Sequence, residues 1–144
     1  MIIPALSEIK DKAPVEAGEY ELVISKAKLT KSQKTGRYGC MLIINIEGHN
    51  DADTIFHTLW YGNFDDGAGN SFNDDDDDKN ENMWRRVKDF IRSIGLDPEN
   101  ETDESDLVGL EFTAEVGYND GMGTDDDGNP IKLGQPRNEI LRVL

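Results

Sequence analysis

The chain has 144 residues and a formal net charge of −15, from 30 acidic and 15 basic residues. This length indicates one domain, because two domains would each be too small to bury a good core. The sequence predicts no membrane-spanning helix, since no apolar run reaches about 18 residues, and the single cysteine, Cys40, excludes an internal disulfide and a cysteine-rich metal site.

The acidic residues are concentrated in three segments. Residues 65–82, 97–106 and 120–127 hold 18 of the 30 acids and only one base, Lys79. The rest of the chain carries a net charge of +2, and residues 22–46 contain five bases and no acid. Because charges are screened over roughly 8–10 Å at ordinary salt, a basic face can coexist with acidic loops. The net charge therefore does not by itself exclude nucleic-acid binding.

The first part of the chain is predicted to form an arm followed by a strand. Residues 1–17, which contain two prolines, are predicted to form an N-terminal arm, and residues 18–144 a single domain. The first strand starts at Gly18, and its alternation of apolar and polar residues shifts phase after Lys26. A phase shift inside a strand indicates a bulge or a sharp bend.

Two more strands are predicted after a turn. Residues 30–38 form a polar, basic hairpin turn, residues 39–47 a nearly continuous apolar strand, and residues 53–61 a strand rich in β-formers. Alternation puts Phe56 and Trp60 on one face of this third strand and its odd-numbered residues on the other. Both faces mix polar and apolar residues, so the pattern leaves open which face joins the core.

A helix is predicted between two long loops. Residues 62–82 contain Gly, Asn and Asp and almost nothing to bury, which favours a loop. Apolar residues at helical spacing then predict a helix over 83–94, with Asn80 or Asn82 as the N-cap and Gly95 at its C-terminal end.

The remaining residues predict two strands joined by a loop. These are a fourth strand over 107–118, a Gly/Asp loop over 119–136 and a fifth strand over 137–144. The order predicts a mainly β fold, a five-stranded OB-fold barrel with one α-helix between strands three and four and long acidic loops. The alternative is an open β-sandwich with the helix packed across one end.

Six short segments, in their order, carry a family resemblance that covers most of residues 16–144. They are the Gly-Glu-Tyr of 18–20, the Lys-Thr-Gly turn of 34–36, the strand 55–60, the helix ending in Phe-Ile-Arg-Ser-Ile-Gly-Leu at 96, the Leu-Val-Gly of 107–109, and residues 137–140. The chain thereby resembles phage replication-module proteins. These are small single-stranded-DNA-binding proteins of the OB-fold type, many still filed as domains of unknown function. Many such proteins end in an acidic tail, whereas here the acid is internal.

A basic hairpin and nearby aromatic residues form the predicted DNA site. Single strands are bound by cations along the backbone and by aromatic faces against the bases. In an OB-fold, the loop between strands one and two borders the binding groove. The candidate DNA-binding residues are Lys28, Lys31, Lys34, Arg37, Tyr38, Trp60, Tyr61, Phe64 and Arg137.

Catalysis is not expected. The two histidines and the cysteine stand in no catalytic pattern, no phosphate-binding glycine motif is present, and the acidic loops fail the EF-hand spacing. We therefore predict no enzymatic activity, no catalytic residue, no cofactor and no metal.

The expected function is binding of single-stranded DNA with little sequence preference, in phage DNA replication or recombination. The expected location is the cytoplasm of the bacterial host cell, without secretion or membrane contact. Replication or recombination proteins are candidate partners of the acidic loops. Two other readings stay open: an acidic interaction module or DNA mimic that docks on a replication or host enzyme, and a small virion structural module. The oligomeric state stays open between monomer and dimer.

Overall fold

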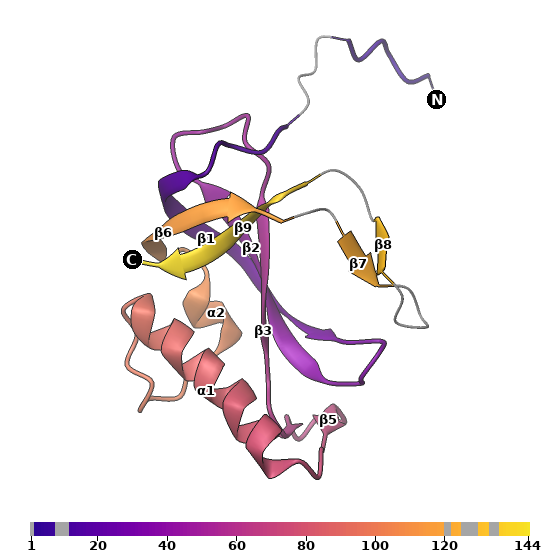
Figure 1. The fold of residues 1–144 in the computed structure, drawn as a ribbon, viewed down its shortest axis with the longest axis vertical. Helices are drawn as coiled ribbons and strands as arrows, with labels where there is room; N and C mark the ends of the chain where they lie inside the picture. The colour runs from indigo at the N-terminus through magenta and orange to yellow at the C-terminus, as the bar shows by residue number, and fades with distance from the viewer. Residues whose placement is uncertain (1, 8–11, 120–121, 125–129, 133–135) are drawn as a thin grey trace.

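The computed structural model describes residues 2–7, 12–119, 122–124, 130–132 and 136–144. Five strands form the main sheet: β1 (Gly18–Lys31), β2 (Tyr38–Ile46), β3 (Ile55–Trp60), β6 (Glu111–Tyr118) and β9 (Asn138–Val143). All neighbours are antiparallel, in the order β3-β2-β1-β6-β9. The two outermost strands, β3 and β9, come into contact, so the sheet is a nearly closed barrel (Figure 1). The predicted mainly β, five-stranded fold is confirmed at this level.

The predicted irregularity in the first strand is a β-bulge. The register between β1 and β2 shifts between Ile24 and Lys26, and the intervening Ser25 donates from Oγ to the carbonyl of Ile43 at 2.9 Å. Ile24 and Lys26 each have a partner on β2, and the extra residue reverses the alternation beyond it. The bulge is why Leu22 and Ile24 are buried while Lys26 and Lys28 are exposed.

The core fills the inside of the curled sheet. Its largest fully buried side chains come from β1, β2, β3 and β6: Leu22, Ile24, Cys40, Leu42, Ile44, Ile55 and Val116. On β3, the odd-numbered Ile55 and Leu59 are buried, whereas Phe56 is 47% exposed. The structure thus resolves the choice of faces that the sequence left open, because the even-numbered residues of β3 point outward.

The helix α1 (Asp77–Ser93) closes one side of the core, through buried Phe90 and Ile91. It starts six residues before the predicted position, and its N-cap is Asp76, which accepts from the backbone N–H of Lys79. The acidic side chains of Asp77 and Asp78 in the first turn are favourable at the positive end of the helix dipole, so the end of the acidic run is helical rather than loop. The expected Asn80 and Asn82 caps are wrong, and the expected stop at Gly95, with φ +95°, is confirmed.

Short elements occupy segments that the sequence predicted as loop. Two-residue strands β4 (Phe64–Asp65) and β5 (Ser71–Phe72) form a small hairpin before α1, and β7 (Met122–Thr124) pairs with β8 (Pro130–Lys132). The short helix α2 (Glu104–Leu107) lies in the predicted acidic linker and includes only the first residue of the predicted fourth strand; Asp103 and Asp106 form a capping box at its start. The observed strand β6 begins at Glu111, four residues later than predicted. Most of the third acidic segment and parts of the predicted arm lie outside the described residues. No helix among the described residues is long and apolar enough to cross a membrane.

Candidate nucleic-acid interface

Outward-pointing residues of β1, β2 and β3 form one continuous surface. The strand register aligns them in rows across the sheet, Lys26 with Ile43 and Phe56, and Lys28 with Met41 and Thr58. The next row is Thr30, Gly39 and Trp60. We call this surface the outer face, and it comprises Lys26, Lys28, Met41, Ile43, Phe56, Thr58 and Trp60. The two lysines and Phe56 are exposed, and the other members are half-buried.

The ring of Trp60 lies over a glycine on the neighbouring strand. A Cβ on Gly39 would approach the carbonyl oxygen of Leu59 to 2.7 Å and the Trp60 ring to 2.9 Å. The absence of a side chain at Gly39 therefore lets the indole lie close to the backbone of β2. Trp60 as a whole is half-buried, so part of its side chain is open to solvent. This is the arrangement that a stacking platform for a base requires.

Arg137 brings a cation to the outer face from a distant part of the chain. Its guanidinium carbon lies 5.6 Å from the centroid of the Phe56 ring. Reciprocal hydrogen bonds with Asn119 hold its backbone, since Arg137 N donates to Asn119 Oδ1 at 3.1 Å and Asn119 N donates to the Arg137 carbonyl at 2.8 Å. The structure thus brings Arg137 together with β3, which the sequence could not reveal.

The lysines of the predicted hairpin are open to solvent. Lys28, Lys31 and Lys34 are exposed, and Lys31 Nζ lies 5.5 Å from the centroid of the Tyr38 ring. Lys26 and Lys28 point to the outer face, whereas Lys31, the partner of Tyr38, is out of phase with them, and Lys34 lies in the turn that follows β1. None of these four lysines forms an ion pair within the described part of the chain.

Arg37, by contrast, is a structural residue, and its expected contact with DNA needs correction. The residue is only 4% exposed. The guanidinium donates to the carbonyl of Tyr61 at 2.8 Å, pairs with Asp74 at 3.2 Å and lies 4.6 Å from the Phe72 ring centroid. These contacts of the guanidinium hold the β1–β2 turn against β5 and the acidic run.

Tyr38 is also packed into the fold. It is 8% exposed, its ring lies 5.5 Å from that of Phe64, and its hydroxyl is 3.4 Å from Asn70 Oδ1. A base cannot stack on a ring that is covered in this way. Tyr38 contributes instead to the attachment of the β4–β5 hairpin.

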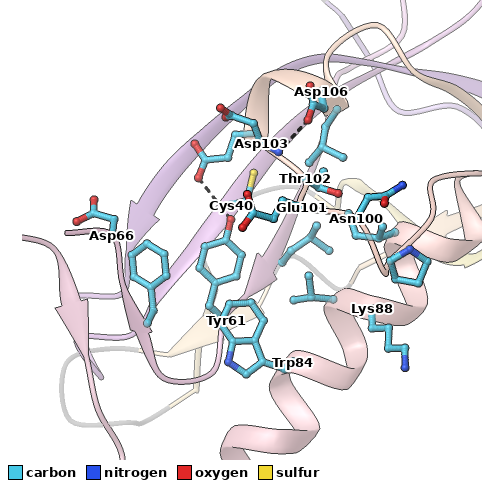
Figure 2. A pocket seen from close by; sticks show the side chains of 17 residues that line it. Cys40, Tyr61, Asp66, Trp84, Lys88, Asn100, Glu101, Thr102, Asp103 and Asp106 are labelled. Atoms are coloured by element: carbon cyan, nitrogen blue, oxygen red, sulfur yellow. Dashed lines mark hydrogen bonds between the residues drawn. The ribbon is translucent and has the colours of Figure 1, made fainter. Parts of the chain in front are cut away.

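Tyr61 and Phe64 lie on the other side of the β2–β3 hairpin. The Tyr61 ring stacks on Trp84 of α1, with centroids 5.1 Å apart and planes 14° apart, and it also contacts Phe64. The hydroxyl of Tyr61 faces Glu104 Oε1 at 3.4 Å (Figure 2). Burial raises the pKa of Tyr61, with the nearby Cys40 and Glu104 adding to the shift. The structure therefore separates these two aromatic residues from Trp60.

Five members of the outer face are absent from the predicted site: Lys26, Met41, Ile43, Phe56 and Thr58. Once the odd-numbered residues of β3 are known to be buried, the alternation predicts that Phe56 is exposed. The bulge in β1 likewise predicts that Lys26 is exposed. Met41 has no signal in the sequence, because its exposure depends on the register between β2 and its neighbours.

Two titratable groups, the buried Cys40 and the half-buried His57, are shielded from water by the fold. His57 stacks on Phe90 with centroids 5.1 Å apart, and burial lowers its pKa. Burial likewise raises the pKa of the Cys40 thiol to about 11, with Glu104 adding to the shift. No cluster of three or more His, Cys, Asp or Glu side chains suited to a metal ion occurs among the described residues.

The fold and this surface define a class, a small mainly β protein whose barrel-like sheet carries a mixed basic and aromatic outer face. The chain belongs to the family described as protein of unknown function DUF669, whose pattern it matches over residues 5–124. No curated protein matches the chain.

Proposed function

We propose that this protein binds single-stranded DNA with little sequence preference, on the outer face of an OB-fold. The strand order β3-β2-β1-β6-β9, with β9 returning to β3, is the connectivity expected of that fold. OB-folds bind oligonucleotides on the face of strands two and three and on the flanking loops. In this chain that region corresponds to β2, β3, the turn at 32–37 and the segment that carries Arg137.

The observation that carries the proposal is the alignment of cations and aromatic rings in adjacent rows. Lys26 and Lys28 lie on β1, two strands away from Phe56 and Trp60 on β3. Neighbouring strands are about 4.8 Å apart, so the cations and the rings are separated by about 10 Å. A single strand laid across the sheet places its phosphates beside the lysines and its bases on the rings.

The geometry favours single strands over duplex. The bases of a duplex are stacked on each other and offer no face to Phe56 or Trp60, whereas unpaired bases do. Stacking on aromatic residues contributes roughly 1–3 kcal/mol per base and accepts any base, which accounts for the low sequence preference. A role in phage DNA replication or recombination, where single strands are exposed, is part of the proposal.

The negative net charge of the chain determines the affinity that we expect for DNA. Phosphate contacts release counterions, so affinity falls steeply with salt. The acidic segments lower the potential that an approaching strand meets, and we therefore expect modest affinity at physiological salt.

A tryptophan titration tests the proposal. The chain has two tryptophans, so Trp84→Phe leaves Trp60 as the reporter on the outer face. Added oligothymidylate should quench this emission, and increasing salt should weaken the effect steeply. A duplex of equal length should bind at least about tenfold more weakly, because it cannot stack on the rings.

Charge reversal provides the matched control. Lys26→Glu with Lys28→Glu should weaken binding at least about tenfold, since two phosphate contacts are lost and two repulsions are gained. Lys79→Glu with Lys88→Glu makes the same change of charge at exposed positions of α1 and should have a much smaller effect. Equal losses in the two variants, or no quenching of Trp60 at low salt, would refute the proposed site.

A further inference from the structure

A second surface lies on the opposite side of the β2–β3 hairpin from the outer face. It is a cleft of about 980 Å³ between β3, α1 and the segment that leads into α2 (Figure 2). Successive side chains of a strand point to opposite faces. Cys40 and Leu59, which line the cleft, therefore alternate with Met41, Thr58 and Trp60 of the outer face.

The floor of the cleft is apolar and aromatic. Leu59, Val87, Ile91 and Leu107 line it, together with the stacked rings of Tyr61 and Trp84. Trp84 is 37% exposed, although it is anchored by a hydrogen bond from Nε1 to the carbonyl of Asn63 at 3.2 Å. A large apolar side chain that is fixed in place yet open to solvent is typical of a binding site.

The rim of the cleft is strongly acidic. It carries five carboxylates and a single basic side chain, Lys88: the acids are Asp66, Glu101, Asp103, Glu104 and Asp106. Figure 2 shows Asp103 and Asp106 at the α2 end and Asp66 beyond the aromatic rings. None of the five forms an ion pair within the described part of the chain. Such a rim repels nucleic acid and attracts cations.

We propose that this cleft docks a basic segment of a partner protein, one in which arginine or lysine alternates with apolar side chains. Apolar side chains of the segment would fill the floor, and its cations would face the rim carboxylates. A guanidinium over Trp84 or Tyr61 would add a cation–π interaction. Because the two surfaces lie on opposite faces of the same strands, a partner in the cleft and DNA on the outer face can be bound together.

The test uses the other tryptophan. Trp60→Phe leaves Trp84 as the reporter in the cleft, and the probe is a short capped peptide of alternating arginine and leucine. We expect a saturable change in Trp84 emission that salt weakens. A peptide of alternating glutamate and leucine should not bind, and one of alternating arginine and serine should bind more weakly, because it cannot fill the apolar floor.

Variants that neutralise two carboxylates of the rim test whether the rim binds the peptide. Glu101→Gln with Glu104→Gln should weaken peptide binding about fivefold, and the amide oxygen at position 104 can still accept from Tyr61. The matched control is Glu81→Gln with Glu99→Gln, which removes two exposed acids outside the cleft and should leave binding unchanged. Urea unfolding of both variants verifies that they fold.

Three results would overturn the proposal: no saturable signal at millimolar peptide, equal binding of the glutamate peptide, or unchanged affinity after loss of Glu101 and Glu104. Oligothymidylate read through Trp60 is a separate measurement. A failure of DNA binding therefore leaves the peptide result intact, and the reverse also holds.

Discussion

Replacement of Arg37 by methionine distinguishes a residue that holds the fold from one that contacts DNA. The methionine keeps the aliphatic packing against Phe72 but removes the guanidinium. The carbonyl of Tyr61 then loses a charged donor at 2.8 Å, an interaction worth about 1.5–3 kcal/mol. The pair with Asp74 adds less than about 1 kcal/mol, because the Asp74 side chain is 27% exposed and water replaces part of the interaction.

We therefore expect Arg37→Met to lower the free energy of unfolding by roughly 2–4 kcal/mol, a large share of the 5–15 kcal/mol typical of a domain. Urea unfolding followed by circular dichroism measures this. The control is Lys34→Met in the same turn, which should stay within about 0.5 kcal/mol because Lys34 is exposed. Oligothymidylate affinity of folded Arg37→Met should change less than twofold. An unchanged urea midpoint together with a clear loss of DNA affinity would refute the structural role.

Three further predictions follow from buried positions. Gly39→Ala should cost about 1–3 kcal/mol of stability and change Trp60 emission, because the new Cβ would meet the Leu59 carbonyl and the indole; wild-type stability would contradict the packing of Trp60. Cys40, 1% exposed and with a pKa raised to about 11, should react slowly with iodoacetamide at pH 8 until urea unfolds the chain, and rapid native alkylation would argue against its burial. Burial lowers the pKa of His57 in the folded state, so the unfolded chain binds more protons below about pH 6.5 and stability falls there as the pH decreases. His57→Phe should remove that part of the pH dependence, and an identical slope in both proteins would contradict it.

The strands and the bulge were predictable because they depend on local patterns. Alternation up to Ile24 and its reversal at Lys26 required only the sequence. The faces of β3 were not predictable, since His57 and Thr58 make both faces look mixed. The choice depends on the pairing of Ile44 with Ile55, which fixes the register of all three strands.

The candidate site was predicted in part, because its chemistry is local but its geometry is not. Lys28, Lys31 and Trp60 could be identified from residue type and strand position. Arg37 has the same local signature as Lys34, and only its partner Asp74, 37 residues further along the chain, shows that it is buried. The pairing of Tyr61 with Trp84 likewise depends on where α1 packs.

The row of five aspartates that begins at Asp74 has a practical consequence for protein engineering. Asp74 holds Arg37, Asp76 caps α1, and Asp77 and Asp78 fill its first turn. A deletion intended only to make the protein less acidic would therefore remove the ion pair between Arg37 and Asp74 together with the first turn of α1. Asp75 is exposed and takes no part in those contacts, which makes it the position in the row where a charge can be neutralised while the fold is kept.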